Sequence, residues 1–140
     1  VIEYAQLHGS EDAAYIEALR KRTALLGKTA RIIKTVKVGS TADLENISEI
    51  DCEYLLLDAW SKEGEAAGGN GRTFDWSLIK ALEKPFFLAG GLTVDNVQQA
   101  VRMTSPYGID ASSCMETEDC KDLNKMKAFA QAVRVTETNN

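Results

Sequence analysis

Apolar residues follow two alternating patterns along the chain, and each pattern predicts a different kind of element. Short runs rich in Val, Ile, Leu and Phe predict strands at residues 2–7, 31–38, 54–58, 86–88 and 107–111. Segments with apolar residues three or four positions apart predict helices at residues 10–27, 75–82, 96–103 and 122–135. A short, poorly patterned helix is expected at residues 41–47. Strand and helix alternate five times, which predicts an α/β fold with a parallel sheet and right-handed crossovers.

The boundaries of these segments carry signals for turns and helix starts. Ser10, Asp75 and Thr93 each stand where a side chain can accept from the first turn of a helix, so we expect them to be N-caps. The glycine-rich residues 61–73 predict a loop, which is either a lid over a site or a flexible linker. Residues 136–140 are expected to form a frayed tail.

Length and composition limit the class of protein. The 140 residues suffice for one domain with a core, so we take residues 1–140 as a single domain. The net charge of −5 disfavours a nucleic-acid partner, which usually leaves a basic footprint. No apolar run approaches the roughly 20 residues that cross a bilayer, so no membrane partner is expected. The three cysteines lack metal-ligand spacing and predict reduced thiols, a cytoplasmic location and no metal site.

Small residues follow two consecutive predicted strands, and this pattern indicates an anion site. Gly90 and Gly91 follow residues 86–88, and Ser112 and Ser113 end the segment around 107–111. Small residues allow close backbone approach, and the helix starts expected beyond them offer free N–H groups. Two such loops in succession are how a (β/α)8 barrel holds a phosphate, so we expect a small phosphorylated ligand. The alternative is that Gly90-Gly91 forms only a tight turn.

Two further polar residues stand at strand ends, where α/β proteins place their chemistry. Asp58 ends the apolar strand 54–58 and is expected among the apolar surroundings of Leu55–Leu57. Its carboxyl group is either a proton-transfer group or a partner for loop amides. His8 is the single histidine and shares a strand face with Gln6, so it is either a substrate contact or a structural residue.

Six groups of residues follow one another in a characteristic order. They are Gln6-Leu7-His8-Gly9, Leu55-Leu56-Leu57-Asp58, Gly68-Gly69-Asn70-Gly71-Arg72-Thr73-Phe74-Asp75-Trp76, Leu88-Ala89-Gly90-Gly91-Leu92, Asn96-Val97, and Asp110-Ala111-Ser112-Ser113 with Lys121-Asp122. Together they resemble phosphoribosylanthranilate isomerase, over essentially the whole chain. That family has a single (β/α)8 barrel, and this sequence resembles its units four to eight. The resemblance therefore implies a partial TIM barrel of five βα units.

The resemblance implies an intramolecular oxidoreductase, an aldose–ketose isomerase of tryptophan biosynthesis that needs no cofactor. Its reaction is the Amadori rearrangement of N-(5-phosphoribosyl)anthranilate to the aminoketose phosphate. By this resemblance Asp58 is the general acid, and the substrate phosphate is bound by Gly90, Gly91, Ser112 and Ser113.

The same resemblance implies that this chain alone is inactive. The family's general base, a cysteine, and its carboxylate-binding arginine belong to the first three units. None of Cys52, Cys114 and Cys120 stands in the context of that base. Two apolar sheet edges would be exposed, so the expected partner is the missing N-terminal units or a second copy across those edges. The family commonly has glycine where Cys114 stands, which requires ordinary backbone angles at this cysteine.

Two other interpretations are compatible with the residues. A five-stranded parallel sheet also suits a flavodoxin-like module that binds a phosphometabolite without turnover. A barrel isomerase acting on a related aminoaldose is the third interpretation, and the Phe74-Asp75-Trp76 run argues against it.

Overall fold

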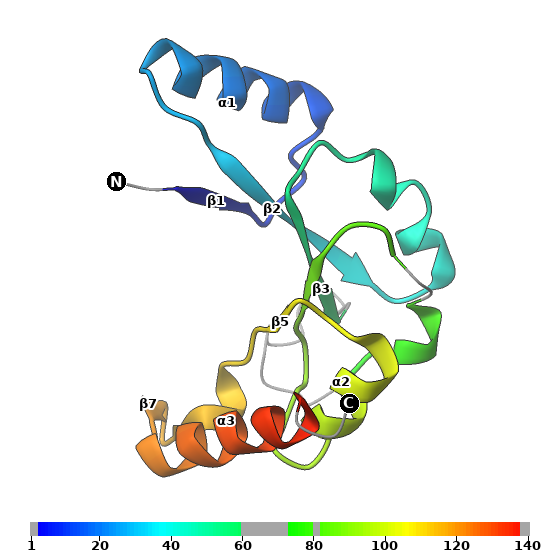
Figure 1. Cartoon of the computed structure of the whole chain (residues 1–140), viewed down its shortest axis with the longest axis vertical. Helices are drawn as coiled ribbons and strands as arrows, with labels where there is room; N and C mark the ends of the chain where they lie inside the picture. The colour runs from blue at the N-terminus through cyan, green and yellow to red at the C-terminus, as the bar shows by residue number, and fades with distance from the viewer. Residues whose placement is uncertain (1–2, 60–72, 80–81, 138–140) are drawn as a thin grey trace.

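A parallel sheet of five strands organises the chain in chain order, β1-β2-β3-β4-β5. The computed structural model describes residues 3–59, 73–79 and 82–137. Figure 1 shows β1 and β2 beneath α1, and β5 toward α2 and α3. The strands are β1 (Tyr4–Leu7), β2 (Arg31–Val38), β3 (Tyr54–Ala59), β4 (Phe86–Leu88) and β5 (Gly108–Ile109).

The strand order confirms the predicted parallel α/β fold and corrects one alternative. Every neighbouring pair in this sheet is parallel. A flavodoxin-like sheet has the order 2-1-3-4-5, because its first crossover runs in the opposite direction from the others. In this chain each strand pairs with the next one in sequence, as in a barrel wall, so the flavodoxin-like interpretation is wrong.

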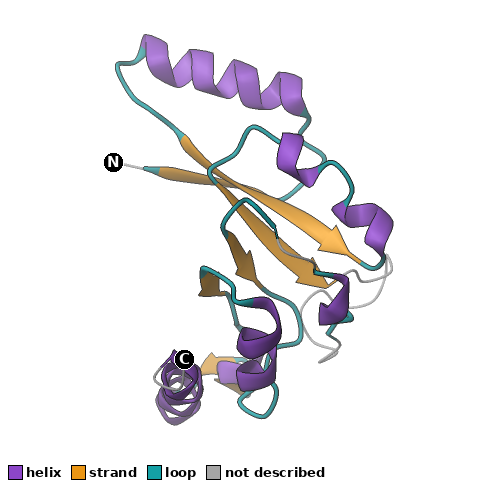
Figure 2. Ribbon diagram, turned by 45° about the vertical axis from the view of Figure 1, so that its right-hand side comes forward, coloured by secondary structure: helices purple, strands orange, loops and turns teal. Residues whose placement is uncertain are grey.

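Helical segments lie along one side of the curved sheet (Figure 2). They are α1 (Ala13–Leu25), α2 (Val97–Thr104), α3 (Leu123–Glu137) and the 3-10 turns η1 (Thr41–Leu44), η2 (Ile47–Glu49), η3 (Trp76–Leu78) and η4 (Ser113–Met115). An antiparallel hairpin of β6 (Glu116–Thr117) and β7 (Cys120–Lys121) precedes α3. The sequence pattern did not predict this hairpin.

The core lies between the sheet and the helices. Leu55 and Leu57 of β3 are fully buried, and they belong to one cluster with helix residues Ile16, Val97 and Phe129. Burying such a side chain contributes about 1.5–3 kcal/mol relative to leaving it exposed. Because strand side chains alternate, Leu56 and Asp58 point to the opposite face of the sheet.

That opposite face carries an aromatic group at the amino ends of the strands. Tyr54 lies at its centre, with ring centroids 5.9 Å from Tyr4, 5.5 Å from Phe87 and 4.8 Å from Tyr107. The neighbouring hydroxyl of Tyr107 raises the pKa of Tyr54 to about 12. The aromatic group therefore links β1, β3, β4 and the start of β5 across the sheet.

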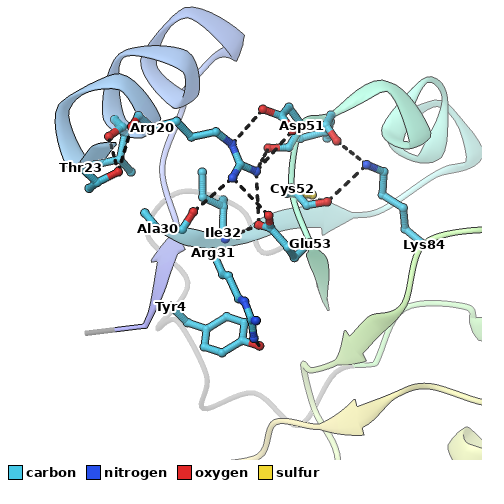
Figure 3. A network of polar contacts seen from close by, with 12 residues as sticks. Tyr4, Arg20, Thr23, Ala30, Arg31, Ile32, Asp51, Cys52, Glu53 and Lys84 are labelled. Carbon is cyan, nitrogen blue, oxygen red and sulfur yellow. Dashed lines mark hydrogen bonds and ion pairs between the residues drawn. The ribbon is translucent and has the colours of Figure 1, made fainter. Parts of the chain in front are cut away.

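A polar network joins α1 to the sheet at the same amino ends (Figure 3). Arg20 donates to Asp51 Oδ2 at 2.9 Å and to Glu53 Oε1 at 3.1 Å. The carboxylate of Glu53 also accepts from the N–H of Ile32 at 2.6 Å. Partial burial opposes ionisation of Glu53, but the bonds from Ile32 and Arg20 outweigh it and lower its pKa. Lys84 continues the network by donating to the carbonyls of residues 50 and 52.

The structure corrects several predicted helix boundaries. Asp12, not Ser10, caps α1 by accepting from the N–H of Tyr15 at 2.8 Å. Asn96, not Thr93, is the N-cap of α2, whereas Asp75 caps η3 as predicted, accepting from Ser77.

Two predicted helices are shorter than their sequence patterns indicated. Residues 41–47 contain η1 and the first residue of η2, and the part of 75–82 that is described forms only η3. The tail was predicted to fray from residue 136, but α3 continues through Glu137. The glycine-rich loop lies outside the described residues, apart from Thr73.

Candidate active site

The carboxyl ends of β3, β4 and β5 surround one cavity of about 150 Å³. Parallel neighbouring strands lie about 4.8 Å apart, so the loops that follow them meet at one edge of the sheet. The cavity is lined by Asp58, Ala89, Gly90, Gly91, Leu92, Asp110, Ala111, Ser112 and Ser113. The structure therefore brings together the predicted acid and all the predicted phosphate-binding residues.

The turn after β4 requires glycine at its first position. Gly90 has a φ of +84°, and a Cβ atom placed on it would lie 2.5 Å from the backbone nitrogen of Ala59. The same Cβ would lie 2.8 Å from Asp58 Oδ1, so Gly90 packs directly against the end of β3. Gly91 also has a positive φ of 63°. The predicted tight turn is therefore present, and it lines the cavity where the phosphate loop was predicted.

Asn96 holds this turn, a role that sequence reasoning missed. Its Nδ2 donates to the carbonyl of Gly91 at 3.0 Å, and its Oδ1 accepts from the N–H of Thr93 at 2.8 Å. The signal was present in the sequence, because asparagine side chains often bond to nearby backbone groups in turns. Asn96 therefore joins the glycine turn to the start of α2.

Free backbone donors surround the cavity. Within the described part of the chain, the N–H groups of Gly90, Gly91, Ser112 and Ser113 have no hydrogen-bond acceptor. Clustered N–H groups of this kind form a concave site that suits an anion. The Ser112-Ser113 loop leads into the short turn η4 rather than into the α-helix that the sequence predicted.

Asp58 faces a cation rather than the predicted apolar surroundings. The register of β2 and β3 places Lys37 opposite Asp58, and Lys37 Nζ forms an ion pair with Asp58 Oδ2. Leu55 and Leu57 lie on the other face of the strand, which explains why they do not enclose the carboxylate. Sequence reasoning missed Lys37, since only the register between strands brings the two residues together. With Oδ2 held by Lys37, Oδ1 lies toward Gly90.

The structure does not bring His8 to this cavity. His8 is exposed after β1, and β2 lies between β1 and β3. Among the described residues, no group of three His, Cys, Asp or Glu side chains could hold a metal ion. No helix in the described ranges is long and apolar enough to span a membrane.

None of the three cysteines lines the cavity at the ends of β3, β4 and β5. Cys52 is buried in the core, and burial raises the pKa of its thiol. Cys114 is partly buried in η4, where desolvation also raises its pKa, and its φ is not in the left-handed region. The ordinary backbone required at Cys114 is therefore present. In the segment that follows Cys114, Glu118 and Asp119 in the turn of the hairpin adopt the left-handed conformation, with φ of 51° and 60°.

Comparisons with known proteins agree with the motifs. Residues 1–132 match the model of the family described as N-(5'phosphoribosyl)anthranilate (PRA) isomerase. An N-(5'-phosphoribosyl)anthranilate isomerase of Acetivibrio thermocellus is 42% identical over 140 residues, covering 95% of this chain and 62% of that protein. The chain likewise spans 62% of the length of other curated relatives that it matches.

Solved structures resemble the fold in the same way. The phosphoribosyl anthranilate isomerase of Thermotoga maritima superposes with a TM-score of 0.77 at 30% identity, covering 96% of this chain and 62% of that one. A second isomerase structure holds reduced 1-(o-carboxyphenylamino)-1-deoxyribulose 5-phosphate. It superposes with a TM-score of 0.71 at 27% identity, covering 96% of this chain and 60% of the other.

Proposed function

This chain belongs to the N-(5'-phosphoribosyl)anthranilate isomerase family. We propose that it supplies the phosphate-binding loops and the general acid of that family's active site. The single observation that carries the proposal is the cavity where Asp58 meets Gly90, Gly91, Ser112 and Ser113. A carboxyl group beside a cluster of free N–H groups matches a substrate that has both a phosphate and a ring oxygen to protonate.

The proposed reaction is the Amadori rearrangement of N-(5-phosphoribosyl)anthranilate in tryptophan biosynthesis. In this step the bond between C1′ and the ring oxygen breaks, the oxygen gains a proton, and C2′ then loses one. We assign Asp58 the role of the general acid that protonates the ring oxygen, because a general acid must lie within hydrogen-bond reach of the reacting atom. Lys37 contacts Oδ2 of Asp58, so Oδ1 is directed to the cavity at Gly90, and in the acid form of Asp58 this oxygen would carry the transferred proton.

The phosphate is proposed to lie against the two loops after β4 and β5. The related isomerase that holds a 5-phosphate sugar analogue superposes over 96% of this chain. The N–H groups of these loops would donate to the phosphate oxygens without requiring a side-chain cation inside the cavity. This arrangement suits a chain whose net charge is −5, because local geometry rather than a broad positive field holds the anion.

The chain is further proposed to correspond to units four to eight of an eight-unit barrel. Its five strands follow barrel order, and it spans 62% of the length of its relatives. Among the described residues, β1 and β5 each have one neighbouring strand, so both outer edges are available for pairing. The proposed complement of these five units is the family's first three units, which carry its base.

A complementation assay tests this function. The chain is assayed for conversion of phosphoribosylanthranilate alone, and again after mixing with a polypeptide carrying the first three units of the Acetivibrio thermocellus relative. We expect no turnover by the chain alone and measurable turnover by the mixture. Turnover by the chain alone near that of a whole barrel would refute the need for a partner. A stable but inactive complex that still binds phosphate would favour a binding module without catalysis.

A further inference from the structure

Lys121 and Asp122 form a motif whose role the cavity alone does not explain. Both follow the turn of the hairpin β6–β7, directly before α3. Asp122 accepts from the N–H of Asn124 at 2.8 Å and from the hydroxyl of Thr117 at 2.9 Å. It therefore joins the hairpin to the start of α3, which is a structural role. Neither residue lines the cavity.

Lys121 points from the hairpin back to the cavity wall. Its Nζ donates to Ser112 Oγ at 2.8 Å and to the carbonyl oxygen of Ser112 at 3.2 Å. It also forms an ion pair with Glu116. Ser112 itself lines the cavity, so an ammonium group is anchored directly behind the loop that we assign to the phosphate.

The bond from Lys121 determines where the Ser112 hydroxyl can donate. A serine hydroxyl has one proton and two lone pairs. Lys121 donates to one lone pair, so the proton of Ser112 is available to another acceptor. Glu116 Oε1 lies 3.4 Å from Ser112 Oγ, which is long for a bond between two oxygens. A phosphate oxygen in the cavity would be a better acceptor at an ordinary distance.

We propose that Lys121 is a positioning residue for the phosphate site, and that it orients the Ser112 hydroxyl for donation to the bound anion. This inference rests on the proposed function, since it requires that the cavity bind phosphate. Lys121 acts through Ser112 and does not itself enter the cavity. A hydroxyl that accepts from an ammonium is also polarised toward donation, and charge-assisted bonds of this kind are stronger than neutral ones.

The test is a titration of this chain with inorganic phosphate, followed by NMR of the backbone amides. K121M is compared with K125M, in which a neighbouring lysine of α3 is removed. Lys125 Nζ donates to the carbonyl of Glu116 at 2.6 Å, so both variants lose one charge and a contact with Glu116, but only K121M loses the bonds to Ser112. We expect K121M to bind phosphate roughly tenfold more weakly than the unmodified chain, and K125M to bind it with unchanged affinity. K121R, which keeps the charge and the donors, should recover most of the affinity.

The outcomes separate the two proposals. If the unmodified chain binds phosphate and K121M binds it equally well, the role of Lys121 is refuted while the phosphate site stands. Equal losses in K121M and K125M would show a general charge effect and would also refute the role. If the unmodified chain binds no phosphate at the Ser112 and Ser113 amides, both the site and this inference fail. Should K121M not fold, the Lys121 ammonium signal of the unmodified chain is followed instead. It must shift with phosphate while that of Lys125 does not.

Discussion

Replacing Gly90 with alanine should lower the free energy of unfolding and weaken phosphate binding at the same time. The left-handed backbone at φ +84° costs an alanine about 1–2 kcal/mol. The new Cβ would also lie 2.5 Å from the nitrogen and 2.7 Å from the Cβ of Ala59, so the loop and the end of β3 must separate. Overpacking of this kind costs about 1–3 kcal/mol, which gives a total of roughly 2–5 kcal/mol.

Gly27 provides a matched control for the backbone contribution. It has a φ of +65°, and a Cβ atom there would meet no atom within 4 Å. The G27A variant should therefore lose only the left-handed contribution of about 1–2 kcal/mol. The entropic effect of removing a glycine from the unfolded chain is shared by both variants and cancels in their difference. The difference between G90A and G27A then measures the contact between Gly90 and β3.

Urea unfolding of the two variants measures that difference. We expect G90A to be less stable than G27A by about 1–3 kcal/mol. In a parallel titration, G90A should bind inorganic phosphate more weakly, whereas G27A should bind it as the unmodified chain does. Equal stability of the two variants would show that Gly90 does not pack against Ala59 and Asp58. A destabilised G90A with unchanged phosphate affinity would leave Gly90 a structural residue and remove it from the site.

Three further predictions concern ionisable residues, one in catalysis and two in the pH dependence of stability. In the complemented enzyme, D58N should reduce kcat by about 10²–10⁴-fold with little change in KM, and a nearly normal kcat would remove Asp58 from the mechanism. The pKa of Glu53 is lowered in the folded chain, so its contribution is present above the ordinary value of 4.5 and is lost as pH falls through the folded pKa. Stability measured against pH should show a shallower acid decline in E53Q, and an identical decline would contradict this assignment. The pKa of Tyr54 is raised from 10.0 to about 12, so its contribution is present below pH 10 and is lost as pH rises toward 12. Y54F should lack this alkaline loss in the same measurement.

Local sequence patterns predicted those strands and helices whose residues have a strong intrinsic preference for that conformation. The β-branched run of β2 was predicted over the residues that it occupies, 31–38, because such side chains favour extended backbone. The convergence of the loops after β4 and β5 was also predictable, since consecutive parallel strands are neighbours in most sheets. Helix ends were less predictable, because Asp12 and Ser10 are both good caps and only the packed position of α1 selects Asp12.

Local patterns along the chain are enough to predict the parallel α/β class, the family, and the chemical groups that meet at the cavity. Short apolar runs, glycines and motif order are local properties, so they can be read without coordinates. The tertiary structure decided that β1 to β5 lie in chain order, which excludes the flavodoxin-like sheet. It also decided the partners of the functional groups, Lys37 for Asp58 and Lys121 for Ser112. These pairs depend on strand register and on a short hairpin, and both are set by packing between residues distant in the chain.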